Sequence, residues 1–295
     1  MKHKSGFVNI IGNPNVGKST LMNAFVGERL SIITSKAQTT RHRILGIVNT
    51  DNYQIVFSDT PGVIKPAYEL QESMMGFVKS AFEDADILVY MVEVGEKELK
   101  DEDFFNKITN AKVPVILLLN KIDRSNQVQL EEQVELWSLK VPNAEIYPIS
   151  ALEKFNTQTV FDRILELLPE CPPYYPKDAL TDKPERFFVN EIIREKILLN
   201  YDKEVPYAVE VETEEFTEAE DIIRIKSVIM VERDSQKGII IGHKGSALKK
   251  VGIAAREEME QFFLKKVHLE LFVKVNKDWR NNDYQLRRFG YNQKK

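Results

Sequence analysis

The stretch GNPNVGKST, residues 12–20, contains the residue types needed to hold a phosphate chain. It matches the pattern G-x-x-x-x-G-K-[ST] and lies between the apolar run FVNII and a segment with helical spacing, where this pattern joins a strand to a helix. Glycine lets several backbone N–H groups approach one anion, and the N-terminus of the following helix adds positive potential. The stretch therefore predicts a nucleoside triphosphate site, with Lys18 on the β- and γ-phosphates and the Ser19 hydroxyl on Mg²⁺. The expected contacts within it are Gly12, Asn13, Pro14, Asn15, Val16, Gly17, Lys18, Ser19 and Thr20.

The segment NKID, residues 120–123, follows an apolar run and indicates which base is bound. The carboxylate of Asp123 can accept hydrogen bonds from both the ring N–H and the amino group of guanine, whereas adenine presents no such donor pair. The stem of Lys121 can pack along the base, and ISAL, residues 149–152, can offer backbone N–H groups to the guanine oxygen. The expected base-binding residues are Asn120, Lys121, Ile122, Asp123, Ser150, Ala151 and Leu152.

Two further polar segments contain groups for Mg²⁺ and for the γ-phosphate. SDTPG, residues 58–62, supplies a carboxylate at Asp59 for Mg²⁺ and a backbone N–H at Gly62 for the γ-phosphate, a contact that hydrolysis would remove. QTTRHR, upstream, supplies a hydroxyl from Thr39 or Thr40 that could complete the Mg²⁺ shell. The expected nucleotide contacts in this region are Asp59, Thr60, Pro61, Gly62 and Val63.

These segments need a scaffold of alternating strands and helices, and the first half of the chain has that pattern. The runs DILVYMVEV, VPVILLLN and AEIYPIS are continuously apolar, as expected for central parallel strands buried on both faces. ILGIVNTD and YQIVFSDT flank Asp51 and Asn52 as the strands of an antiparallel hairpin would. We therefore predict an α/β P-loop domain over residues 1–170, with a mostly parallel sheet and one antiparallel edge strand.

A proline-rich segment interrupts this pattern. Five prolines lie between Pro169 and Pro184. Because proline fixes φ and removes a donor, we expect residues 171–185 to form a stiff, extended linker. The remaining residues, 186–295, read as a helix, two strands, two helices and a strand. This order agrees with an α+β type II KH domain.

GHKG, residues 242–245, fits the G-x-x-G loop of a KH domain. Its two glycines would let a sugar-phosphate backbone approach closely, and the lysines that follow would extend a cationic strip. The expected RNA contacts are Gly242, His243, Lys244, Gly245, Lys249 and Lys250. Of Ile239, Ile240 and Ile241, which could line a groove for bases, we expect most to be core. The helix that follows is expected to turn Leu248, Val251, Ala255, Met259 and Phe262 inward.

Composition narrows the class of protein. The chain has 295 residues, 43% of them apolar, and no apolar stretch long enough for a transmembrane helix. Its single cysteine, Cys171, cannot form an internal disulfide, which fits a reducing cytoplasm. The net charge of −4 is uneven: residues 1–185 contain 20 Lys/Arg and 26 Asp/Glu, whereas residues 237–295 contain 14 and 6. A basic C-terminal quarter suggests an anionic partner.

The motifs together resemble the Era family of bacterial ribosome-assembly GTPases. GNPNVGKSTLMNAFVG, KAQTTRHRILGI and DTPG carry the resemblance in the first half, and EIIREKI, IIIGHKGSALKKVGIAAREEME, VHLELFVKV and LRRFGY carry it in the second. The resemblance covers the whole chain. It implies a Mg²⁺-dependent GTPase that binds GTP and GDP and that contacts the single-stranded 3′ end of 16S ribosomal RNA through its KH domain.

Further expectations come from the resemblance alone. It implies a role in assembly of the 30S ribosomal subunit, a cytoplasmic location with peripheral membrane association, and a monomeric state. Alignment with related GTPases favours Thr40 over Thr39 as the Mg²⁺ ligand, beside Ser19 and Asp59. We assign catalytic roles to Lys18, Thr40 and Gly62. Asn15 resembles the residue of GTPases that use K⁺ in place of an arginine finger.

The position after Gly62 is Val63, where Ras-like enzymes carry the glutamine that orients the attacking water. We therefore expect slow intrinsic hydrolysis. Two other functions stay open: a P-loop kinase that phosphorylates a small acceptor, and an RNA-binding scaffold with vestigial nucleotide binding. The guanine motif argues against the kinase, and the intact Lys18, Ser19 and Asp59 argue against the scaffold.

Overall fold

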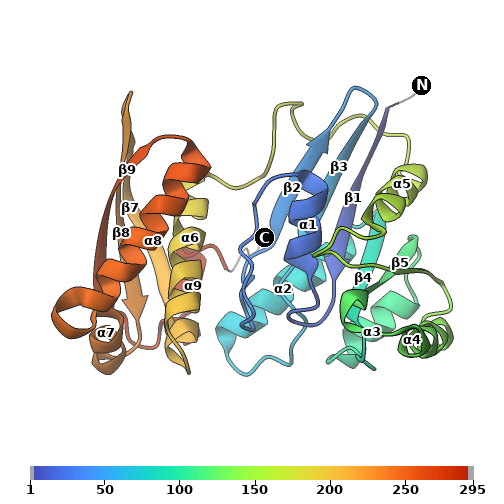
Figure 1. The fold of residues 1–295 in the computed structure, drawn as a ribbon, viewed down its shortest axis with the longest axis horizontal. Coiled ribbons are helices and arrows are strands. Elements are labelled where there is room, and N and C mark those ends of the chain that lie inside the picture. Colours follow the sequence, from blue (N-terminus) through green and yellow to red (C-terminus); the bar gives the residue numbers. More distant parts are fainter. Residues whose placement is uncertain (1–2, 292–295) are drawn as a thin grey trace. The chain divides into compact units, whose positions relative to one another are not determined.

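The computed structural model describes residues 3–291, which form two compact units (Figure 1). The first unit runs to Asp182 and the second begins at Lys183, except that Tyr68–Leu70 are grouped with the second unit. Each is built around its own sheet, one of six strands and one of three.

The first unit is an α/β domain with the predicted sheet. The six strands lie in the order β2-β3-β1-β4-β5-β6; β2 runs antiparallel to β3 and all other neighbours are parallel. The prediction of one antiparallel edge strand is therefore confirmed. The strands are β1 (Lys4–Ile11), β2 (Ile44–Asn49), β3 (Tyr53–Asp59), β4 (Ile87–Glu93), β5 (Val115–Asn120) and β6 (Ala144–Pro148). The helices are α1 (Lys18–Val26), α2 (Glu69–Glu83), α3 (Glu102–Thr109), α4 (Gln127–Lys140) and α5 (Thr157–Leu167).

The apolar runs place the core in the middle of this sheet. Every residue of β5, and all of β4 except Glu93, is buried, as expected of strands covered on both faces. The same expectation is wrong for β6. It is the edge strand, and its residues are only partly buried or exposed, because one of its sides has no neighbouring strand.

The carboxyl ends of the parallel strands meet at one edge of the sheet. The phosphate loop follows β1, SDTPG begins at the end of β3, NKID begins at the end of β5, and ISAL follows β6. In open α/β sheets ligands bind at this edge. The topology thus brings four segments together that are up to about 140 residues apart in sequence.

The chain after α5 lies along β2 and β3 rather than leaving the first unit. Gly46 forms a bridge with Thr181, the amide of Ile47 donates to the Leu180 carbonyl at 2.8 Å, and the side chain of Gln54 bonds to Tyr174 and Tyr175. Much of the segment we expected to be a linker is therefore fixed to the first unit.

The second unit has the element order predicted for a type II KH domain. Strand β7 pairs antiparallel with β8, and β8 pairs parallel with β9. The elements are α6 (Glu185–Asn200), β7 (Glu210–Glu218), β8 (Ile222–Val231), α7 (Asp234–Ile241), α8 (Ser246–Phe263), β9 (Lys266–Val275) and α9 (Asp283–Arg288). No helix within residues 3–291 is long and apolar enough to cross a membrane.

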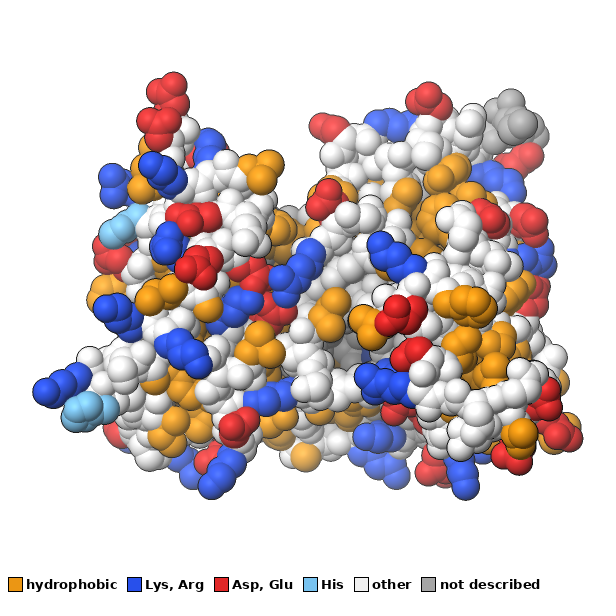
Figure 2. Space-filling view, in the orientation of Figure 1, with side chains coloured by type: hydrophobic (Ala, Val, Ile, Leu, Met, Phe, Trp, Pro, Cys, Tyr) orange, Lys and Arg blue, Asp and Glu red, His pale blue; other side chains and the backbone are white. Residues whose placement is uncertain are grey.

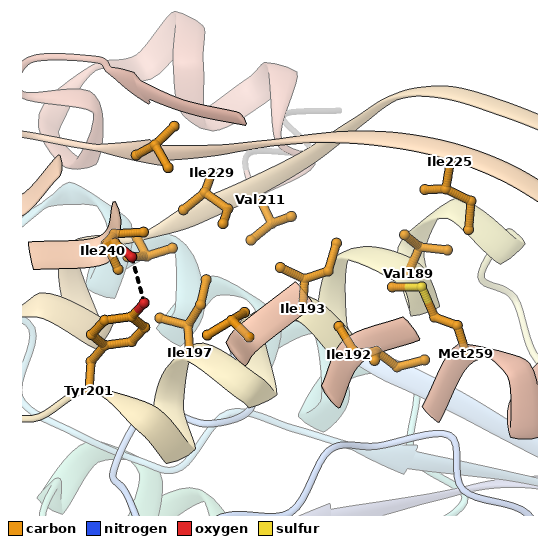
Figure 3. Packing of buried hydrophobic residues seen from close by; sticks show 14 of the residues in the cluster. Val189, Ile192, Ile193, Ile197, Tyr201, Val211, Ile225, Ile229, Ile240 and Met259 are labelled. Atoms are coloured by element: carbon orange, nitrogen blue, oxygen red, sulfur yellow. Dashed lines mark hydrogen bonds between the residues drawn. The ribbon is translucent and has the colours of Figure 1, made fainter. Parts of the chain in front are cut away.

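The core of the second unit lies between α6 and the sheet. Figure 3 shows Ile193 and Ile197 of α6 beneath Val211 and Ile229 of the strands, with the Tyr201 hydroxyl donating to the Ile240 carbonyl at 2.7 Å. Further members of this core are Val189, Ile192, Ile225, Val251, Ala255 and Met259.

The prediction that most of the three isoleucines are core is confirmed, whereas one predicted helix position is wrong. Ile240 is fully buried and Ile241 packs against the core, whereas Ile239 is 50% exposed. Phe262, which we expected to face inward, is 38% exposed, and its neighbour Phe263 packs on the core instead. The buried face of α8 runs at a spacing of four through Val251, Ala255 and Met259 to Phe263, and Phe262 lies beside it with its ring 5.3 Å from that of Phe188.

Candidate functional site

The phosphate loop takes a conformation that depends on its small residues. Gly17 has φ of 109° and Asn15 has φ of 66°, both in the left-handed region. A Cβ at Gly12 would lie 2.2 Å from the Met91 carbonyl oxygen, so β4 packs against the loop too closely for any side chain. These contacts fix the loop between β1 and α1.

Lys18 is held inside the phosphate loop. Its Nζ donates to the carbonyl oxygens of Gly12, at 3.2 Å, and Asn13, at 2.8 Å. Burial lowers the pKa of Lys18 to about 8, although the nearby charges of Asp59 and Glu96 oppose the shift. A buried cation with its own partners in the loop is positioned to meet an anionic phosphate.

The three residues predicted to bind Mg²⁺ lie together. The Ser19 hydroxyl donates to Asp59 Oδ2 at 2.7 Å, and Thr40 Oγ1 lies 3.0 Å from Ser19 Oγ and 3.4 Å from Asp59 Oδ2. Thr39 instead bonds the Lys36 carbonyl and Thr34. Among the described residues, Asp59 Oδ1 is buried without a hydrogen-bond partner.

This donor set fits a hard divalent cation. It offers one carboxylate and two hydroxyl oxygens, the ligand types that Mg²⁺ prefers. Burial raises the pKa of Asp59, against the opposing charge of Lys18. A bound cation would satisfy the unpaired oxygen and offset the cost of burying the carboxylate.

Asn120 connects the phosphate loop to both base-binding segments. Its Nδ2 donates to the Val16 carbonyl at 2.7 Å, and its Oδ1 accepts from the Ala151 amide at 2.9 Å. The Ser150 hydroxyl donates to Asp123 Oδ1 at 2.6 Å, which orients the carboxylate predicted to read guanine. Lys121 Nζ donates to the Asn15 carbonyl at 2.6 Å and pairs with Glu93.

A pocket of about 440 Å³ joins these groups. Of the predicted residues, it is lined by Pro14, Asn15, Gly17, Lys18, Ser19, Thr20, Thr40, Gly62, Asn120, Lys121, Asp123, Ala151 and Leu152. Sequence reasoning missed the lining residues Ile32, Ile33, Thr34, Ser35, Gln38 and Arg124, and it placed Thr39 only as a Mg²⁺ alternative. The loop between α1 and β2 carries no motif over residues 32–35, and Gln38 was quoted only as the start of QTTRHR, so the fold was needed to reveal that part of the lining.

Several other predicted residues support the pocket from behind without lining it: Gly12, Asn13, Val16, Asp59, Thr60, Pro61, Val63, Ile122 and Ser150. The Thr60 hydroxyl donates to the Ile10 carbonyl at 2.7 Å. Val63 is fully buried, and its amide donates to the Gly12 carbonyl at 3.0 Å. The side chain at the position of the missing glutamine therefore packs into the core.

Asn13 clamps the phosphate loop to the loop between β4 and α3. Its Nδ2 donates to Glu96 and to the Glu98 carbonyl, and its Oδ1 accepts from the Lys100 amide at 3.1 Å. Burial raises the pKa of Glu96. No sequence motif pointed to Glu96, because the contact joins segments about 80 residues apart.

The G-x-x-G loop of the second unit lies between α7 and α8. Gly242 and Gly245 have φ of 71° and 79°, and Lys244 also has a positive φ, of 48°. A Cβ at Gly242 would lie 2.6 Å from Ala247 Cβ, so the turn needs glycine there. Figure 2 shows Lys and His side chains projecting at the α7 end of this unit.

A groove of about 370 Å³ runs from this loop between α8 and β9. Gly245 and Lys249 line it, whereas Gly242, His243, Lys244 and Lys250 do not. Sequence reasoning missed its other lining residues, which are Leu248, Gly252, Ile253, Arg256, Leu269 and Leu271. Apart from Arg256 these side chains are small or apolar and carry no signal of RNA binding in the sequence. Leu269 and Leu271 come from β9, a strand that only the fold brings to α8.

Comparison with known families gives the same two parts of the chain, a GTPase domain followed by a KH domain. The family model described as 50S ribosome-binding GTPase matches residues 7–121, and the KH domain model matches residues 204–280. The first match spans the phosphate loop to the start of NKID, and the second spans the G-x-x-G loop and groove.

Two solved structures resemble the whole chain. One is Era in complex with MgGDPNP and nucleotides 1506–1542 of 16S ribosomal RNA, and the other is a variant of Aquifex aeolicus Era bound to GDP·AlF4⁻. Each is 40% identical, covers 98% of this chain and 99% of its own, and has a TM-score of 0.93. With the phosphate loop, the guanine motif and the KH unit present in one chain, the protein belongs to the Era family of GTPases.

Proposed function

We propose that the protein is a GTP-driven switch that binds the 3′ end of 16S ribosomal RNA and assists assembly of the 30S subunit. One observation supports nucleotide binding. A single pocket is lined by Lys18, Asn120 and Asp123, and by Ser19 and Thr40, which bond Asp59. The Era structure with RNA and MgGDPNP supports the RNA part, since it resembles this chain over nearly its full length.

In this proposal Lys18 binds the β- and γ-phosphates, and Ser19, Thr40 and Asp59 hold Mg²⁺. The metal supplies neutralisation of the charge on the phosphate oxygens. Gly62 binds the γ-phosphate through its amide. Because Gly62 and Thr40 contact groups that only the triphosphate places there, they supply the differential affinity that a switch requires.

Hydrolysis is expected to be slow. Ordering the attacking water needs a hydrogen-bonding side chain, and the apolar Val63 is packed in the core. We also propose that K⁺ supports turnover beside Asn15, whose Nδ2 donates to the Ser35 carbonyl at 2.9 Å and so joins the phosphate loop to the loop that contains Thr40. Equal hydrolysis rates in sodium and potassium buffers would refute this point.

RNA would lie in the groove of the KH unit. Gly245 would permit close approach of the backbone, Lys249 and Arg256 would contact phosphates, and the apolar wall with Ile253 and Leu271 would face the bases. His243, Lys244 and Lys250 would extend the basic strip beyond the groove. We further propose a cytoplasmic monomer that associates peripherally with the membrane, on the family resemblance.

Two measurements test the proposal. Purified protein given equimolar ATP and GTP should retain only the guanine nucleotide, and equal retention of ATP would refute the base assignment. RNA affinity should differ tenfold or more between a GTP analogue and GDP, about 1.4 kcal/mol of coupling. Equal affinity with the analogue, with GDP and without nucleotide would indicate two independent domains.

A further inference from the structure

The segment of residues 174–182, which we call the strap, adds to the edge of the first sheet. Strand β2 is an edge strand, so one side of its backbone would otherwise lack partners. The strap supplies them: Leu180 accepts from the Ile47 amide at 2.8 Å, and Asp182 Oδ1 accepts from the Leu45 amide at 3.1 Å.

The strap is also anchored at its other end. Gln54 is fully buried; its Oε1 accepts from the Tyr174 and Tyr175 amides at 2.8 and 2.9 Å, and its Nε2 donates to the Tyr175 carbonyl at 2.9 Å. Tyr175 and Ala179 pack against a small apolar cluster of Leu45, Ile47 and Val56. These contacts hold the strap as a fixed part of the first unit.

The Asp182 end of the strap adjoins both functional parts of the chain. On one side, Leu45 lies five residues after Thr40, in the strand that leads directly out of the loop lining the nucleotide pocket. On the other, only Lys183 and Pro184 separate Asp182 from the first residue of α6. Proline stiffens even this short connection.

We propose that the strap transmits the nucleotide state from β2 to the KH unit. This inference rests on the proposed function, because it assumes that RNA affinity depends on the nucleotide. When Thr40 engages the triphosphate site, the start of β2 is held in register and the Leu45 amide keeps Asp182 in place. When Thr40 is released, the start of β2 loosens and the last residues of the strap are freed, which lengthens the tether to α6.

Two variants of the full chain test this. Asp182→Ala removes the acceptor for the Leu45 amide. Insertion of Gly-Ser-Gly after Asp182 changes no residue of the strap and relaxes the connection to α6. Asp162→Ala is the matched control, because Asp162 is an exposed carboxylate on α5 that bonds only Gln158 in the described hydrogen bonds.

The readout is the affinity for a single-stranded oligonucleotide of the 16S 3′ end, with a GTP analogue and with GDP. We expect the RNA affinities with the GTP analogue and with GDP to differ tenfold or more in the parent chain and in Asp162→Ala. The difference should be threefold or less in Asp182→Ala and in the insertion variant. GDP affinity should stay within twofold, which shows that the pocket is intact. A ratio of tenfold retained by either test variant would overturn the inference alone. A ratio of one in the parent chain would overturn the proposed switch as well.

Discussion

Replacing Asn120 should affect both the stability of the first unit and its affinity for nucleotide. Asn120 is 2% exposed and forms two buried hydrogen bonds, with the Val16 carbonyl at 2.7 Å and the Ala151 amide at 2.9 Å. Asn120→Ala leaves both backbone groups without this partner, at about 1–3 kcal/mol each, so the first unit should lose about 2–6 kcal/mol of stability. Because the same bonds tie the phosphate loop to the base-binding segments, GTP and GDP affinity should fall together by at least tenfold.

The assay must report on the first unit alone. The chain has two tryptophans: Trp137 in α4 of the first unit and Trp279 in the second, both fully buried. In a Trp279→Phe background, fluorescence during urea unfolding follows Trp137. GDP at 100 times Kd should then raise the free energy of unfolding of the parent by about 2.7 kcal/mol. At the same GDP concentration the gain in the Asn120→Ala variant should be smaller.

The exposed Asn110, at the end of α3, provides a control. Asn110→Ala removes an amide whose bonds lie at the surface, and it should change stability by no more than about 0.5 kcal/mol. If Asn120→Ala unfolded within 1 kcal/mol of the parent and kept its GDP affinity, the connecting role given to this side chain would be wrong.

Three further predictions follow from the same geometry. Val63→Gln should destabilise the first unit by about 2–4 kcal/mol and should not speed hydrolysis, because it buries an amide in the core; a faster phosphate release in single-turnover assays would contradict this. GDP affinity should begin to fall near pH 8, by up to about tenfold per pH unit above it, since Lys18, with a pKa of about 8, binds phosphate only when protonated; Lys18→Arg, which stays charged, should give a flat profile across pH 7 to 9, below the ionisation of the guanine ring N–H. Lys249→Gln should weaken RNA binding more than Lys250→Gln, because only Lys249 lines the groove; Lys249→Gln should lower the slope of log affinity against log salt by about 0.7 and Lys250→Gln by less, and equal losses would remove the groove from the RNA path.

Much of the architecture could be predicted because it depends on local patterns. Continuous apolar runs identified β4 and β5 as central strands, and the turn residues Asp51 and Asn52 identified the β2–β3 hairpin. The same pattern failed for β6, since an apolar run does not reveal whether a strand has one neighbour or two. Phe262 was misplaced because helical periodicity allows the buried face to continue from Met259 at either i+3 or i+4, and packing selects Phe263.

Some features of the candidate site could also be predicted from local motifs, whereas others depend on contacts between distant segments. The sequence by itself determined which chemical groups follow each strand, because motif spacing fixes a lysine, hydroxyls and carboxylates at the loops of a P-loop scaffold. Only the tertiary structure brought Thr40, rather than its neighbour Thr39, next to Asp59, and turned Val63 into the core. It alone joined Asn13 to Glu96 and the strap to β2. The physical reason is that these contacts link segments from about 20 to more than 130 residues apart, so they depend on how the packed elements align and not on any local periodicity.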